Sequence, residues 1–328
     1  MTPKSHNFAS PSHTSKHPLR LPLLASVLMT AAFSPSADAL LIVPTFDSSI
    51  TGDPNGASMM TGINLAIAQM ESALLNPVTV NIEFKNVNFG LGESSTFFST
   101  PSYSQYLSDL TNNQTLSPND ITALATLPAG PNNPVNAGTS MFLTLPLLRA
   151  IGEPVLGDNG GGFDSTISLN MSLMNFLRTG PQDPGKYDLE QVTLHEIVEV
   201  LGSGGAGSTL GGAGTDIGSM DLFRYSANGV RSYGTSAILP YFSINGGATN
   251  LSFFNQTAGA DYGDWDGAAN PNPQVQDAFS TTGLQLDLSA NELTELDVVG
   301  WNLNPVPEPG SLALLGMGSI LILRRRRA

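Results

Sequence analysis

The chain of 328 residues contains no cysteine and has four histidines. The absence of cysteine excludes disulfide scaffolds and thiolate zinc sites. His6, His13 and His17 all lie near the N-terminus, so residues 40–304 contain one histidine, His195. A metal site in this part of the chain would therefore combine a single imidazole with oxygen ligands.

Basic residues are also scarce. Two of the 27 acidic residues lie outside residues 40–304, whereas seven of the 13 basic residues do, which leaves this segment with a net charge of −19. Such a charge excludes nucleic acid and anionic lipid as expected partners. No phosphate-binding loop, dinucleotide fingerprint or G-x-S-x-G elbow is present. The many carboxylates leave a two-carboxylate glycosidase open as an alternative.

The N-terminus has the pattern of an export signal. Lys4, Lys16 and Arg20 precede an apolar run over residues 21–33, and small residues surround Ala39. A basic region, an apolar region and a small-x-small site are typical of a cleaved signal peptide. We predict a signal peptide over residues 1–39. The alternative is a disordered tail ahead of an internal hydrophobic helix.

The C-terminus carries a second signal, made of a Pro-Glu-Pro tripeptide, an apolar run over residues 311–323 and an arginine cluster. Its residues are Pro307, Glu308, Pro309, Arg324, Arg325, Arg326 and Arg327. This arrangement resembles the PEP-CTERM sorting signal of Gram-negative bacteria. The resemblance implies recognition and cleavage by an exosortase, with secretion to the cell surface or extracellular matrix.

The apolar run within residues 305–328 is short for a membrane span, which needs about 20 residues. The terminal arginines would hold its end in the cytoplasm. Because the run is short, we predict that it forms a transmembrane helix that serves only as a transient inner-membrane tail anchor. A permanent anchor is the alternative.

Residues 40–304 are long enough for one large domain or two small ones. Apolar spacing predicts a helix over residues 56–75 and strands over 78–84 and 163–169. The sequence Ser117-Pro118-Asn119-Asp120, followed by residues 121–127, predicts a short capped helix. Ser289 and Glu292 form a capping-box pattern that opens a last helix reaching residue 299. With glycine-rich segments after residue 202, this order predicts an α+β fold with a loop-rich C-terminal half.

One predicted helix carries the candidate chemistry. Asp188 can cap it, and it contains His195, Glu196 and Glu199 in the order H-E-x-x-E. At 3.6 residues per turn, His195 and Glu199 lie on one face and can bind zinc. Glu196 lies about 100° away, where it can act as general base toward a metal-bound water. The alternative is an amphipathic helix whose charged face is solvated.

The helix and the glycine that follows it, Gly202, resemble the active-site helix of metzincin-type zinc proteases. Gly205 stands where that family has its third histidine, and Met220 resembles part of the family's methionine turn. The motif together with the D-L-F-R-Y-S segment over residues 221–226 also resembles bacterial exported metalloprotease-like proteins. The resemblance implies a zincin-like domain over residues 40–304.

The third ligand has to be an oxygen, because no further histidine or cysteine is available. Asp221 is our first candidate and Asp216 the second, while Tyr225 can polarise the substrate carbonyl.

We expect a zinc-dependent peptidase, a hydrolase acting on proteins or peptides. The alternative is a non-catalytic surface protein that keeps the scaffold and binds matrix polysaccharide. Separately, Asp261, Asp264 and Asp266 precede Gly267 and are a candidate calcium loop, although their spacing is not that of an EF-hand and favours the alternative, an acidic turn without an ion.

Overall fold

The computed structural model describes residues 39–305 except 114, 156–161, 206–207, 209, 211–215 and 235–237. The predicted signal peptide, apart from its last residue, and the Pro-Glu-Pro tripeptide, apolar run and arginines lie outside the described residues. Among the helices that the structure describes, none is both long enough and apolar enough to cross a membrane.

A four-stranded sheet forms the N-terminal half. Its order is β1 (Leu41–Phe46), β2 (Thr79–Asn86), β6 (Ser165–Leu169) and β3 (Gly92–Thr96). β1, β2 and β6 run parallel, whereas β3 is antiparallel and lies at the edge. Side chains alternate along β2, where Val80, Ile82 and Phe84 are buried. One face of the sheet is therefore the core face.

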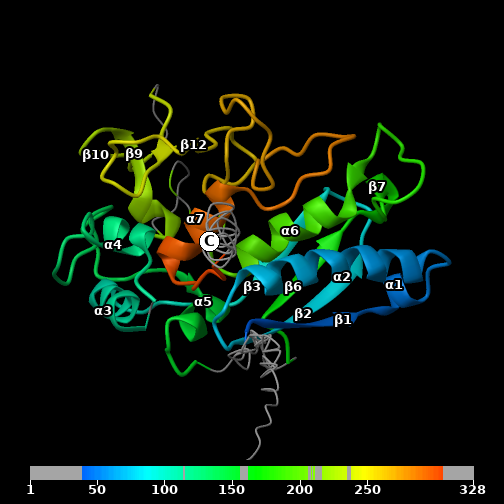
Figure 1. The fold of residues 1–328 in the computed structure, drawn as a ribbon, viewed down its shortest axis with the longest axis horizontal. Helices are drawn as coiled ribbons and strands as arrows, with labels where there is room; N and C mark the ends of the chain where they lie inside the picture. The colour runs from blue at the N-terminus through cyan, green and yellow to red at the C-terminus, as the bar shows by residue number, and fades with distance from the viewer. Residues whose placement is uncertain are drawn as a thin grey trace, which may run out of the picture. The chain divides into compact units, whose positions relative to one another are not determined.

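Two helices cover that buried face, α2 (Gly56–Ala73) and α6 (Leu189–Val200), as Figure 1 shows. A short helix, α1 (Ser48–Thr51), leads into α2. Gly62 permits the close approach of the two long helices, because a Cβ at this position would collide with Phe176 O and touch Leu189. α6 also packs along the edge strand β3, which places the motif helix beside the exposed edge of the sheet.

Between β3 and α6 the chain forms several short helices and strands besides β6. They are β4 (Phe98–Ser99), α3 (Tyr103–Asn113), α4 (Pro118–Leu124), β5 (Leu143–Thr144), α5 (Leu145–Ala150), the 3₁₀ turn η1 (Met171–Leu173), β7 (Met174–Asn175) and β8 (Tyr187–Asp188). Ser117 caps α4 with a capping box that includes Asp120. The capped helix packs against the last helix of the domain.

The C-terminal half is mostly loops. It begins with a 3₁₀ turn, η2 (Met220–Phe223), and contains a small antiparallel sheet of β10 (Val230–Arg231), β9 (Arg224–Ala227), β11 (Tyr241–Phe242) and β12 (Ser252–Phe253). The rings of Phe242 and Trp265 are stacked, and Phe254 packs against Trp265 at a tilt, so that three aromatic side chains hold the loops together. The aromatic cluster gives a loop-rich region a buried core of its own.

A final helix, α7 (Ala290–Val299), joins the two halves. After it, the Trp301 indole N–H donates to Leu201 O at the end of α6, at 2.8 Å. The backbone N–H of Asn304 donates to Ala73 O at the end of α2. The mixed α+β class that we predicted is confirmed, with strands in several separate sheets.

Candidate metal centre

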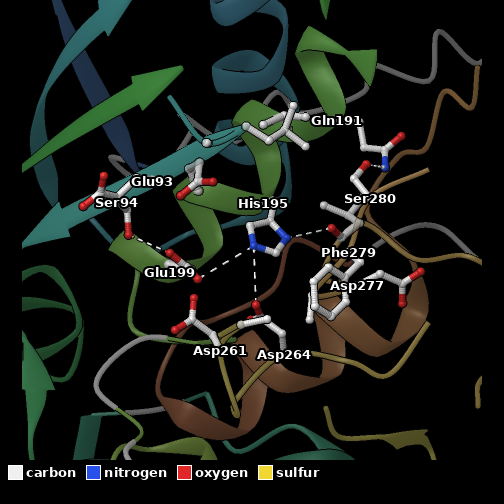
Figure 2. Close-up of a pocket in the computed structure, with 18 of the residues that line it drawn as sticks. Glu93, Ser94, Gln191, His195, Glu199, Asp261, Asp264, Asp277, Phe279 and Ser280 are labelled. Atoms are coloured by element: carbon white, nitrogen blue, oxygen red, sulfur yellow. Dashed lines mark hydrogen bonds and ion pairs between the residues drawn. The ribbon is translucent and has the colours of Figure 1, made fainter. Parts of the chain in front are cut away.

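Helix α6 brings the motif residues to a cavity of about 590 Å³. Asp188 caps the helix by accepting a hydrogen bond from Gln191 N, and Gly202, in the left-handed region at φ +89°, follows its end. Most other side chains of the helix are buried in the core. The cavity lies between α6, the edge strand β3 and the loops over residues 259–280 (Figure 2).

Three side chains converge in this cavity. His195 Nε2 lies 3.7 Å from Glu199 Oε1 and 3.6 Å from Asp264 Oδ2. One ligand atom from each of the three residues lies within 4.8 Å of the other two. Tetrahedral zinc with ligands at about 2.0–2.2 Å separates its ligand atoms by about 3.4 Å. The donor set and its spacing therefore fit a divalent cation.

Each of the three side chains is held by its other polar atom. His195 Nδ1–H donates to Val275 O at 2.9 Å, which leaves Nε2 as the ligand atom. The Ser94 hydroxyl of β3 donates to Glu199 Oε2 at 2.7 Å. These contacts have the form of the outer-shell hydrogen bonds that orient metal ligands.

Asp264 is held in the same way. Its Oδ1 accepts a hydrogen bond from Gln276 Nε2 at 3.0 Å, so Oδ2 is the oxygen that faces His195. Asp264 is 2 % exposed. All three candidate ligands thus present one fixed atom toward a common centre.

Glu196 lies beside this centre, against the edge strand. It is 4 % exposed and lines the cavity. A Cβ at Gly92 of β3 would collide with Glu196 Oε1, so the carboxylate lies directly against the strand backbone. Burial, and next the neighbouring charge of Glu199, raise the pKa of Glu196 well above its usual value. A raised pKa is what a carboxylate needs to act as a base near neutral pH.

The charges of the cluster are tightly coupled. Burial lowers the pKa of His195, but Asp264, Glu196 and Glu199 outweigh it and raise the pKa to about 10. Burial raises the pKa of Asp264 to about 8, against the opposing effect of His195. Protons therefore occupy the cluster at neutral pH, and a bound cation would have to displace them.

The structure places the predicted third ligand elsewhere. Asp221 lies in η2, where its carboxylate accepts from Ser208 Oγ at 2.7 Å and Gly218 N at 2.8 Å. Neither Asp221 nor Asp216 belongs to the group that surrounds His195, and Asp264 lies there instead. Asp221 follows the motif closely in the sequence, which favours it in any prediction from spacing. Asp264 approaches His195 only through a long loop.

Tyr225 lies away from the cavity. It is buried in β9, where the Arg231 guanidinium stacks over its ring at 4.7 Å, and it is not among the residues that line the cavity. Its hydroxyl therefore has no placement in the structure that would let it polarise a substrate bound at His195.

Two of the three aspartates of the candidate calcium loop line the cavity, and the third, Asp266, does not. Asp264 faces His195, and Asp266 Oδ1 accepts from the backbone of Ala268 and Ala269. Asp261 lines the cavity near Glu199. In the part of the chain that the structure describes, the one group of metal-ligating side chains is His195, Glu199 and Asp264. The acidic segment thus contributes Asp264 to the candidate metal centre, whereas the sequence pattern assigned it to a separate calcium site.

Comparison with known proteins identifies the C-terminus. Residues 305–327 match the family of the PEP-CTERM protein-sorting motif. The motif implies processing by an exosortase, export and sorting to the cell surface. No curated protein and no solved structure matches the chain. The zincin-like fold and the peptidase activity therefore have no support from known relatives.

Proposed function

We propose that this exported protein is a metal-dependent peptidase whose zinc ligands are His195, Glu199 and Asp264. The observation that supports this most is the orientation of the three side chains. Each has one polar atom fixed by a neighbour and the other directed at the same point. Three protein ligands and one open position are the arrangement of catalytic zinc sites.

The chain's own residues supply the remaining chemistry. A bound zinc ion would lower the pKa of a water molecule and polarise the scissile carbonyl. Glu196, held against β3, takes the proton of the attacking water and returns it to the leaving amine. Val192 and Val275 supply apolar surface to the walls of the cavity.

The cavity also favours a type of substrate. β3 lies at the edge of its sheet and residues 90–94 line the cavity, so an extended peptide can pair with the free edge. The lining includes Glu93, Asp261 and Asp277 as well as the cluster, and none of the described residues that line it is a lysine or arginine. We infer that the substrates are extended peptides with lysine or arginine near the scissile bond.

The test is metal content and peptide hydrolysis measured on the same preparations. Wild type should bind about one zinc ion per chain, His195→Ala should bind none, and Glu196→Gln should keep zinc but lose hydrolysis. Zinc binding without hydrolysis of any peptide in a mixed library would support the alternative, a surface protein with a structural metal. Absence of zinc from the wild type, even after zinc is supplied, would overturn the proposal.

A further inference from the structure

We propose that Gln276 is a positioning residue for this metal centre, because it fixes which oxygen of Asp264 faces the metal. The inference rests on the proposed function. Gln276 is completely buried, and its Nε2–H donates to Asp264 Oδ1 at 3.0 Å. That bond occupies Oδ1 and leaves Oδ2 for the metal. Asp264 would then bind through one oxygen and leave a coordination position for water.

The backbone of Gln276 is fixed from two sides. Its N–H donates to Glu292 Oε1 at 3.1 Å, and its C=O accepts from Trp265 N at 2.9 Å. Glu292 Oε2 in turn accepts from Ser289 N at the start of α7. The backbone that carries the Gln276 side chain is therefore anchored to the N-terminus of the last helix.

The preceding residue orients the second ligand. Val275 O accepts the hydrogen bond from His195 Nδ1. Two consecutive residues thus hold two of the three ligands, one from α6 and one from the loop that contains Asp264. A shift of this segment would move both ligands together.

Gly204, in the turn after α6, closes the space around the carboxamide of Gln276. Gly204 has φ +60°, and a Cβ there would collide with Gln276 Nε2. On its other side, a Cβ at Gly263 would collide with Gly204 O. Gln276 Oε1 has no hydrogen-bond partner among the described residues. The amide is therefore held by packing and by one polar contact, the bond to Asp264.

The experiment compares Gln276→Met with Gln274→Met in the full-length chain. Gln274 is also buried, at 8 % exposure, but its side chain bonds to Ser252 and Asn291 and contacts no candidate ligand. Zinc affinity is measured by competition with a chelator, and the visible spectrum of the cobalt-loaded protein reports the geometry of the ligands. Loss of an outer-shell partner typically weakens metal binding by about 10- to 100-fold.

Gln276→Met should show this loss of zinc affinity together with an altered cobalt spectrum. Gln274→Met should keep a zinc affinity within about threefold of wild type. Equal affinities and spectra for wild type and Gln276→Met would overturn the inference, as would an equal loss in both variants. If Gln276→Met fails to fold, Gln276→Asn provides the test, because its shorter side chain cannot reach Asp264 Oδ1; zinc affinity should fall by a similar factor, and unchanged affinity would overturn the inference. Absence of metal from the wild type would instead overturn the proposed function.

Discussion

The carboxylate of Glu196 occupies the space in which a side chain at Gly92 would stand. Gly92 is in an ordinary strand of the sheet, and its backbone is not in the left-handed region that requires glycine. The need for glycine there comes from space alone. Because strand residues alternate, Gly92 and Ser94 both face α6, where they meet Glu196 and Glu199.

This relationship predicts the effect of Gly92→Ala. The new methyl group would displace the flexible end of Glu196, so the protein should fold and keep its zinc. Removal of a general base typically costs a factor of 10² to 10⁴, and a displaced one should cost at least about tenfold in kcat. Gly234→Ala is the control, since a Cβ there meets nothing within 4 Å. Full hydrolysis by Gly92→Ala would show that Glu196 is not the base.

The third ligand can be tested by a pair of matched substitutions. Asp264→Asn should abolish zinc binding, because a neutral amide replaces the carboxylate that faces His195. Asp221→Asn should keep wild-type zinc affinity, because Asp221 bonds to Ser208 and Gly218 and not to the cluster. Isothermal titration with zinc measures both. The reverse result would restore Asp221 as the ligand.

Asp221 should also make stability depend on pH. Burial raises its pKa from 3.8 to about 6, despite hydrogen bonds from Ser208 and Gly218. A carboxyl with a raised folded pKa contributes stability below its unfolded pKa, and that contribution is lost as pH rises through the folded value. The expected loss between about pH 4 and pH 6 is on the order of 3 kcal/mol. Denaturant unfolding across this range should show a smaller loss for Asp221→Asn, and identical pH profiles would contradict the assignment.

Calcium should leave the thermal midpoint of the zinc-loaded protein unchanged. The structure directs Asp261 and Asp264 to the cavity, whereas Asp266 caps the backbone of the next turn. They therefore do not surround one ion as a calcium loop does. Thermal unfolding with and without millimolar calcium is the measurement. An upward shift that survives Asp264→Asn would point to a calcium site elsewhere.

Substrate preference should follow the charge of the cavity. Peptides with lysine or arginine near the cleaved bond should be hydrolysed faster than matched peptides with glutamate, because the lining carboxylates attract cations. The ratio of kcat/KM for the basic peptide to kcat/KM for the matched acidic peptide should fall as salt rises from about 0.01 to 1 M, because screening shortens the Debye length from about 30 to 3 Å. A ratio independent of salt would mean that shape, not charge, selects the peptide.

Local signals in the sequence located most of the helices. The predicted helix over residues 56–75 is α2, and the one that Asp188 caps is α6. The Ser289 capping box opens α7, as predicted, and the capped helix predicted from Ser117-Pro118-Asn119-Asp120 is α4. Caps and apolar spacing act within a few residues, so a single sequence is enough to recognise them.

Other elements gave no local signal. β3, Gly-Glu-Ser-Ser-Thr, lacks apolar alternation, because its inward face contacts the carboxylates of α6 rather than the core. The approach of Asp264 to His195 depends on the loops and on α7, which pack through contacts far apart in the sequence. Spacing could therefore predict two of the candidate ligands, which share one helix, but not Asp264.

The end of the domain lies very close to the sorting signal. Asn304 is hydrogen-bonded to Ala73, and Pro307 follows three residues later. Three residues reach at most about 10 Å. An exosortase that acts on the Pro-Glu-Pro tripeptide therefore works either against the surface of the folded domain or before residues 301–304 have packed. The processing signal and the last hydrogen-bonded residue of the described fold are thus separated by fewer residues than one turn of an α-helix.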